Sequence, residues 1–217
     1  RPYFKPKGWA RYSLRIDDFH ETKDWNVAYH GTVARSAFSI MQKGLCNPGE
    51  EGVSVLHGQA GSRTDQTIYT SPSIEYAAFP VYAQFFELDR DHWAQLVFQC
   101  RVRPGSFVER PGTLGNVKHW PHEVQFDPNF KTLEGLEWLV EDREDVRVTA
   151  FLIREFGPNV DTQSYGHLNS LVQDDGCTCE SSVRWAWGCR CRRGPEYTWT
   201  RLREAHFRRQ GWFTEMS

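Results

Sequence analysis

The segment Tyr29-His30-Gly31-Thr32 decides how the rest of this 217-residue sequence is interpreted. Residues 25–30 alternate between large apolar side chains and small or polar ones, a period of two that is typical of a strand. The segment therefore predicts a strand that ends on a histidine. A glycine follows at once and leaves the backbone there open to close approach.

A helix is expected directly after this strand, because apolar residues recur at helical spacing. The stripe consists of Val33, Ala37, Phe38, Ile40 and Met41. Gly44 follows Lys43 and suits the position just after a helix, where a left-handed backbone is common. Residues 46–66 are rich in glycine and poor in large apolar side chains, so we expect a flexible loop there.

Four further strands are predicted from alternation or from short apolar runs. They cover residues 67–70, 94–103, 136–141 and 145–156, and a charged turn at 142–144 separates the last two. Strands outnumber helices, and the expected helices lie early in the chain. The pattern favours an α+β fold, with a split and largely antiparallel sheet and flanking helices.

The segments between these strands carry other signals. Ser71 is expected to cap a short helix whose first turn holds Pro72, and Pro80 should break or kink it. Residues 104–134 contain four prolines and are expected to be irregular. Residues 1–24 are polar, and we expect a lead-in segment with one short helix.

Composition limits the class of protein. Hydrophobic residues make up 39% of the chain, which is enough for the core of one ordinary domain. A net charge of −2 argues against a surface that coats nucleic acid. No apolar run approaches the roughly 20 residues of a membrane span, and no signal peptide is visible. We interpret the chain as an excised piece of a longer intracellular protein that does not associate with membranes.

The composition changes after Gly157-Pro158, so we divide the chain into a domain at 1–160 and a C-terminal extension at 161–217, which could pack on the same domain. The extension is rich in Arg and Trp and holds four of the six cysteines, namely Cys177, Cys179, Cys189 and Cys191. Two such close pairs can bind Zn²⁺ tetrahedrally. A zinc site, two disulfides and free thiols remain open alternatives.

Three residues on the predicted strands carry the functional signal: His30, Tyr69 and Glu137, in that order. Their kind, order and strand context resemble the signature set of the diphtheria-toxin-like ADP-ribosyltransferases, the class that includes poly(ADP-ribose) polymerases. The sequence of residues 68–77 and 127–140 is most similar to the transferase-like domain of neuralized-like proteins and their relatives. The resemblance covers residues 25–156.

The resemblance implies an enzyme that uses NAD⁺ as substrate, releases nicotinamide and transfers one ADP-ribose unit to a protein acceptor that remains unknown. Glu137, His30 and Tyr69 would be the catalytic residues. Glu137 would stabilise the cationic ribose in the transition state, His30 would bind ribose hydroxyls, and Tyr69 would stack on the nicotinamide ring. The NAD⁺-binding set would be His30, Gly31, Thr32, Tyr69, Ser71, Tyr76 and Tyr82, and loop 46–66 would cover the dinucleotide.

The arginine-directed toxins carry an acidic residue or glutamine two positions before the catalytic glutamate. Gly135 occupies that position here, so this pattern is not met, and we expect Glu134 to face solvent. Two alternatives to a transferase that acts on protein stay open. One is a non-catalytic module that binds NAD⁺ or ADP-ribose within a larger ubiquitin-pathway or scaffold protein. The other, which we do not favour, is a transferase whose Arg- and Trp-rich tail directs it to nucleic acid.

Overall fold

The computed structural model describes residues 6–48, 50, 67–89, 92–112, 134–157 and 213–216. Within these ranges the helices are α1 (Phe19–Thr22), α2 (Ala37–Lys43) and α3 (Ile74–Ala77), with the 3₁₀ turns η1 (Ala34–Ser36) and η3 (Arg143–Asp145). The strands are β1 (Ala10–Leu14), β2 (Asn26–Gly31), β3 (Ile68–Thr70), β4 (Phe86–Asp89), β5 (His92–Val102), β6 (Phe107–Arg110), β7 (Glu137–Val140), β8 (Val146–Phe156) and β9 (Phe213–Met216).

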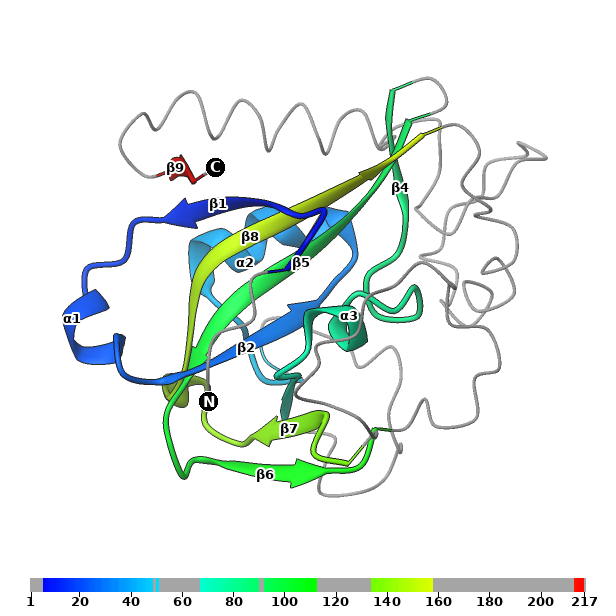
Figure 1. Ribbon diagram of the computed structural model, residues 1–217. Coiled ribbons are helices and arrows are strands. Elements are labelled where there is room, and N and C mark those ends of the chain that lie inside the picture. Colours follow the sequence, from blue (N-terminus) through cyan, green and yellow to red (C-terminus); the bar gives the residue numbers. More distant parts are fainter. Residues whose placement is uncertain are drawn as a thin grey trace.

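The strands form two sheets (Figure 1). The large sheet has the order β2-β5-β8-β1-β9, with β4 paired to β5, and the small sheet has the order β3-β7-β6. Neighbouring strands run antiparallel in both sheets. The expected α+β class with a largely antiparallel, divided sheet is therefore confirmed for the described residues.

Each face of the large sheet is covered. On one face, α2 packs through Ala37, Ile40 and Met41 against a cluster that includes Phe98 of β5 and Phe151 of β8. On the other face, α3 packs through Ile74 and Ala77 against Val97 of β5 and Leu152 of β8. Because both faces are covered, the central strand β5 is buried almost along its whole length.

Most of the predicted elements are confirmed. Strand β2 begins and ends one residue later than the predicted strand at 25–30. Strands β3, β5, β7 and β8 lie within or close to their predicted ranges. Helix α2 ends where Gly44 adopts a φ of 76°, and the Gly44 amide donates to the Ile40 carbonyl at 2.9 Å. The expected helix in the lead-in segment is α1.

Three local predictions were wrong. The cap of α3 is Ser73, whose hydroxyl accepts from the Tyr76 amide, because Ser71 is held in extended geometry by a bridge to Tyr29. Residues 107–110 were expected to be irregular, but they form β6 because they pair with the edge of β7. The lead-in segment also contains β1, in which residues Ala10 to Ser13 pair with β8. In both strands, pairing with a distant partner replaces the missing local signal.

Several expectations fall on residues that the structure does not describe. They are the covering loop, apart from residues 46–48 and 50, the stretch 113–133 and the cysteine cluster of the extension. Of the extension, residues 213–216 form β9, which pairs with β1. No helix in the described part of the chain is long and apolar enough to cross a membrane.

The two cysteines of the described core should differ in reactivity. Cys100 lies fully buried in β5, and burial raises the pKa of its thiol, whereas Cys46 is partly exposed. Since the thiolate is the reactive form, iodoacetamide at pH 8 should label Cys46 while Cys100 stays unlabelled until the protein unfolds. Mass spectrometry of the labelled peptides measures both sites in one sample. Equal labelling of the two cysteines in the folded protein would contradict the burial of β5.

Candidate functional site

The two sheets meet where the end of β2 approaches the end of β3. The Tyr29 amide donates to the Ser71 carbonyl at 2.7 Å, and the Ser71 amide donates to the Tyr29 carbonyl at 2.8 Å. This isolated antiparallel bridge joins Tyr29, the residue before His30, to Ser71, the residue after β3. It brings the first two residues of the predicted set, His30 and Tyr69, onto adjacent strands.

The ring of His30 is fixed by the backbone of β3. Its Nδ1 lies 2.8 Å from the Tyr69 carbonyl oxygen. Because a carbonyl oxygen can only accept, Nδ1 carries the hydrogen, and Nε2 is the acceptor nitrogen of the neutral ring. The histidine is half-buried, so β3 orients a ring that is still accessible in part. The contact also links the predicted His and Tyr directly.

Glu137 and Tyr69 lie on one face of the small sheet. Tyr69 is paired with Leu139, and residues two apart on a strand share a face, so Glu137 projects to the side of Tyr69. The opposite face belongs to the core, where Trp138 stacks on Phe107 at 4.2 Å between ring centroids. The stacked pair anchors β7 and thereby fixes the position of Glu137.

Two tyrosines hold the Glu137 carboxyl group. The Tyr76 hydroxyl donates to Glu137 Oε1 at 2.6 Å, and the Tyr82 hydroxyl lies 3.4 Å from the same oxygen and 3.3 Å from the Tyr76 hydroxyl. A tyrosine has one proton to donate. Tyr76 donates it to Glu137, and Tyr82 shares its proton between its two acceptors.

Glu137 is only 6% exposed, although a glutamate that begins an amphipathic strand is usually solvated. We call Glu137, Tyr76 and Tyr82 the tyrosine clamp.

The clamp distinguishes Tyr76 from Tyr82, which the sequence analysis placed in one NAD⁺-binding set. Tyr76 is 2% exposed, and Gly112 lies so close that a Cβ there would stand 2.7 Å from its ring. Tyr82 is half-buried. The structure thus supports Tyr76 as a residue that holds the carboxyl group, and Tyr69 and Tyr82 as the rings that retain exposed surface.

The remaining predicted residues surround this group. Gly31 ends β2 under α3, and a Cβ at this position would lie 2.0 Å from the Ala77 carbonyl oxygen and 2.8 Å from the Tyr82 Cβ. Thr32 and Ser71 are buried, and the Ser71 hydroxyl accepts from the Ser73 amide at 3.1 Å. Gly31 is therefore needed for packing as well as for any contact of its backbone with a ligand.

The residues just before Glu137 agree with the sequence-based expectation. Glu134 is exposed. Gly135 has a φ of 71°, and a Cβ there would lie 3.3 Å from a Glu109 carboxyl oxygen. An acidic side chain at this position would meet both backbone strain and a like charge. The turn into β7 is thus incompatible with the acidic residue of the arginine-directed toxins.

A polar network behind α3 was not predicted from the sequence. Glu75, next to Tyr76, is 5% exposed and pairs with Arg154 of β8 at 2.9 Å. The Trp9 indole donates to Glu75 at 3.3 Å, and Arg154 also donates to Gln95 at 3.0 Å. The sequence indicated this network only through polar residues, Gln95 and Arg154, on the face of β5 and β8 that α3 covers. Such residues usually indicate solvent exposure, and α3 covers them instead.

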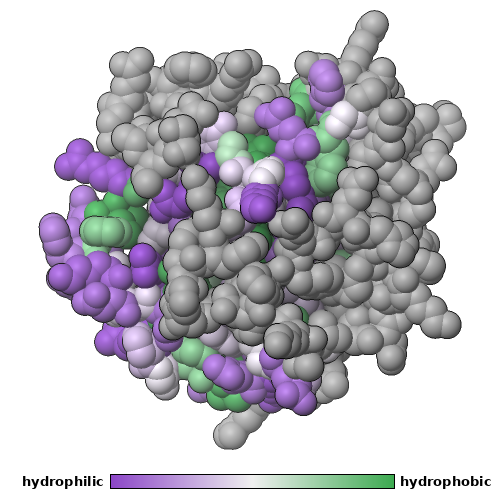
Figure 2. Space-filling view, viewed as in Figure 1, coloured by the Kyte–Doolittle hydropathy of each residue, from purple (hydrophilic) through white to green (hydrophobic). Residues whose placement is uncertain are grey.

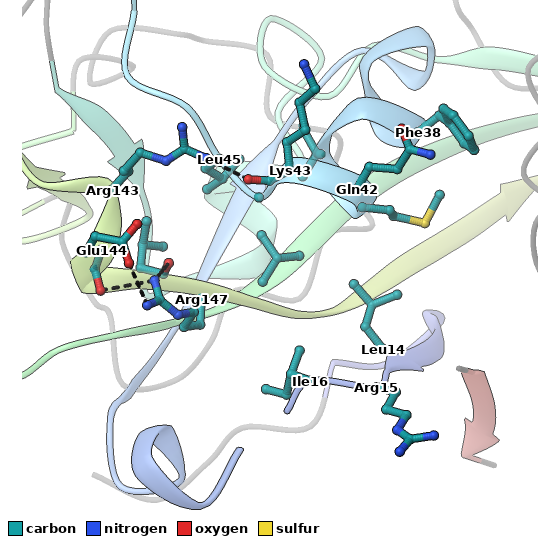
Figure 3. A pocket seen from close by; sticks show the side chains of 15 residues that line it. Leu14, Arg15, Ile16, Phe38, Gln42, Lys43, Leu45, Arg143, Glu144 and Arg147 are labelled. Atoms are coloured by element: carbon teal, nitrogen blue, oxygen red, sulfur yellow. Dashed lines mark hydrogen bonds and ion pairs between the residues drawn. The ribbon is translucent and has the colours of Figure 1, made fainter. Parts of the chain in front are cut away.

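A hollow of about 300 Å³ lies elsewhere, between α2, the end of β1 and the start of β8 (Figure 3). None of the predicted site residues lines it. Its cations are largely engaged: Arg147 pairs with Asp18 and Glu144, and Arg143 donates to the Lys43 carbonyl. On the face that Figure 2 shows, the described surface is mainly hydrophilic with small separate apolar patches. The tyrosine clamp and His30 therefore remain the candidate site.

No group of three or more His, Cys, Asp or Glu side chains within the described ranges is placed to hold a metal ion. The predicted zinc ligands Cys177, Cys179, Cys189 and Cys191 lie outside those ranges. A comparison of the sequence with models of known protein families finds no match.

Replacing Tyr76 by phenylalanine should destabilise the protein, because it removes the short hydrogen bond to a buried carboxyl group. We expect a loss of about 1–3 kcal/mol in the free energy of unfolding, measured by urea denaturation. Tyr82→Phe is the matched comparison and should cost less, since its hydroxyl lies 3.4 Å away from Glu137. An equal or larger loss in Tyr82→Phe would contradict the proposed order of the two contacts.

Replacing Gly31 by alanine should also destabilise the protein, because the added Cβ would overlap the Ala77 carbonyl. Overpacking of this kind costs about 1–3 kcal/mol or more and should lower the melting temperature by several degrees. Gly157→Ala provides the control, since a Cβ at Gly157 meets nothing within 4 Å. Calorimetry of the two variants tests the prediction, and equal melting temperatures would contradict the close approach of α3.

Proposed function

We propose that this chain is an NAD⁺-dependent ADP-ribosyltransferase with the fold of the diphtheria-toxin-like class. In the proposed reaction the bond between nicotinamide and ribose C1′ breaks, and the electron pair leaves with nicotinamide. An acceptor nucleophile on a protein bonds to C1′ and releases its proton. The products are a singly ADP-ribosylated protein, nicotinamide and H⁺.

One observation carries the proposal. His30, Tyr69 and Glu137 come from three different strands, and they gather where the two sheets join, in the order and strand context that the resemblance requires. The His30 ring contacts the Tyr69 backbone, and Tyr69 and Glu137 share a face of the small sheet. Residues 39 and 68 positions apart along the chain need not converge in an unrelated fold.

The geometry supports a distinct role for each residue. Glu137 offers a carboxyl group that is buried, oriented and held by the tyrosine clamp. A negative charge fixed in such surroundings stabilises an oxocarbenium-like transition state more than a solvated one does. Nε2 of neutral His30 is an acceptor suited to a ribose hydroxyl. The half-buried rings of Tyr69 and Tyr82 provide surface for stacking on a planar ring.

Replacing Glu137 by glutamine tests the proposal. The amide keeps the size of the side chain and an oxygen that can accept from Tyr76, but it removes the charge. We expect a melting temperature near that of the wild type, NAD⁺ affinity within about tenfold, and a loss of transfer on the order of 10²-fold or more. Release of labelled nicotinamide and labelling of acceptor proteins measure the rate. His30→Ala should weaken NAD⁺ binding as well as transfer.

Glu134→Gln and Glu141→Gln are matched controls, because both glutamates flank β7 and are exposed. They should retain wild-type rates. Full activity in Glu137→Gln would refute the catalytic assignment. NAD⁺ binding without any nicotinamide release in the wild type would instead support the alternative of a non-catalytic binding module.

A further inference from the structure

The tyrosine clamp belongs to a segment that has little regular structure of its own. Residues 73–83 contain the single-turn helix α3 and then turns, and a helix of four residues is not stable in isolation. Tyr76 and Tyr82, both in this segment, contact the Glu137 carboxyl group. The position of the two hydroxyls must therefore be set by contacts that fix the segment on the rest of the fold.

Gln95 of β5 makes two of these contacts. Its Nε2 donates to the Ala78 carbonyl at 2.7 Å and to the Ala83 carbonyl at 2.8 Å. Ala78 follows Tyr76 by two residues, and Ala83 directly follows Tyr82. One amide group thus fixes the backbone beside both tyrosines. Gln95 is 1% exposed, so water does not readily replace these bonds.

Arg154 of β8 orients that amide and holds α3 from the same side. Its Nη2 donates to Gln95 Oε1 at 3.0 Å, and its Nη1 donates to both Glu75 oxygens at 2.9 and 3.3 Å. The guanidinium contacts the rings of Trp9 and Phe156, with its carbon 4.5 and 5.2 Å from their centroids. Because Arg154 accepts no hydrogen bond, it fixes which end of the Gln95 amide faces the segment.

We infer that Gln95 and Arg154 are positioning residues for Glu137, which act through the tyrosine clamp. They lie on the large sheet and Glu137 lies on the small sheet, so residues 73–83 transmit the position of one sheet to the carboxyl group on the other. The close packing of Gly31 against Ala77 and Tyr82 leaves the segment little freedom to shift by other means.

Gln95→Met tests the inference without reference to catalysis. Methionine has a similar size but cannot donate to the two carbonyls. The readout is the ¹³C chemical shift of the Glu137 carboxyl carbon in protein labelled at glutamate, assigned by its loss in Glu137→Gln. We expect Gln95→Met to move this signal in the same direction as Tyr76→Phe does and by at least half as far. In the Tyr76→Phe background, Gln95→Met should add little.

Gln99→Met is the matched control. Gln99 lies four residues further along β5 and is also buried, but its side-chain oxygen accepts from Arg11 of β1 at 2.7 Å, a residue outside the segment 73–83. Its replacement should leave the Glu137 signal in place. If Gln95→Met does not fold, Arg154→Lys replaces it, because lysine keeps the charge beside Glu75 but lacks the fork that also reaches Gln95. A folded variant of either residue with an unshifted Glu137 signal would overturn the inference.

The kinetic part of the test rests on the proposed function. Gln95→Met should lower kcat for nicotinamide release by about tenfold or more and leave KM within about threefold, because a misplaced carboxyl group acts mainly on the transition state. Gln99→Met should keep both values. If the wild type releases no nicotinamide while the Glu137 signal still shifts, the proposed function fails and the structural coupling stands. If the wild type is active and Gln95→Met alters neither kcat nor the signal, the inference fails alone.

Discussion

The candidate site depends on two backbone hydrogen bonds between Tyr29 and Ser71, at 2.7 and 2.8 Å. They join the large sheet to the small sheet at one point, and each candidate residue is placed relative to that point. His30 follows Tyr29 directly, and Tyr69 lies two residues before Ser71. Glu137 is on the strand that pairs with Tyr69's strand. The divided sheet thus brings three side chains from distant parts of the chain to the junction of the two sheets. Paired strands hold these side chains more rigidly than loops alone would.

Burial of Glu137 costs free energy, and the fold offsets that cost locally. A carboxyl group that is 6% exposed loses most of its hydration, and the Tyr76 hydroxyl at 2.6 Å replaces part of it. A second buried glutamate is compensated in a similar way behind α3, where Glu75 pairs with Arg154 and accepts a hydrogen bond from Trp9. Removing one partner of a buried ion pair such as Glu75–Arg154 commonly costs about 3–5 kcal/mol. The two buried glutamates therefore constrain the segment between the sheets from both sides.

This arrangement explains why the segment after β3 is so fully buried although it is nearly devoid of regular structure. Residues 71–80 are all buried, and groups from β5, β7 and β8 bind the Ala78 carbonyl, the Tyr76 hydroxyl and the Glu75 carboxyl group. A segment of this kind adds little stability through its own hydrogen bonds. In our inference the role of residues 73–83 is geometric, because they carry the hydroxyls of Tyr76 and Tyr82 from the large sheet to a carboxyl group on the small one.

The sequence by itself determined the local elements and the candidate residues. Alternation predicted β2, β5 and β8, and the glycine at position 44 predicted the end of α2. The order His30, Tyr69, Glu137, through the resemblance that it carries, named the members of the candidate site. Tertiary structure alone decided the rest. Strands β1 and β6 exist because partners distant in sequence pair with them, and Ser71 is extended instead of capping a helix because Tyr29 binds it. The burial of Glu137, Glu75 and Gln95 depends on which face α3 covers. Local propensity extends over a few residues, whereas strand pairing and burial depend on contacts between residues far apart along the chain, as in the pairing of Ala10 with Ile153 and of Arg11 with Met216.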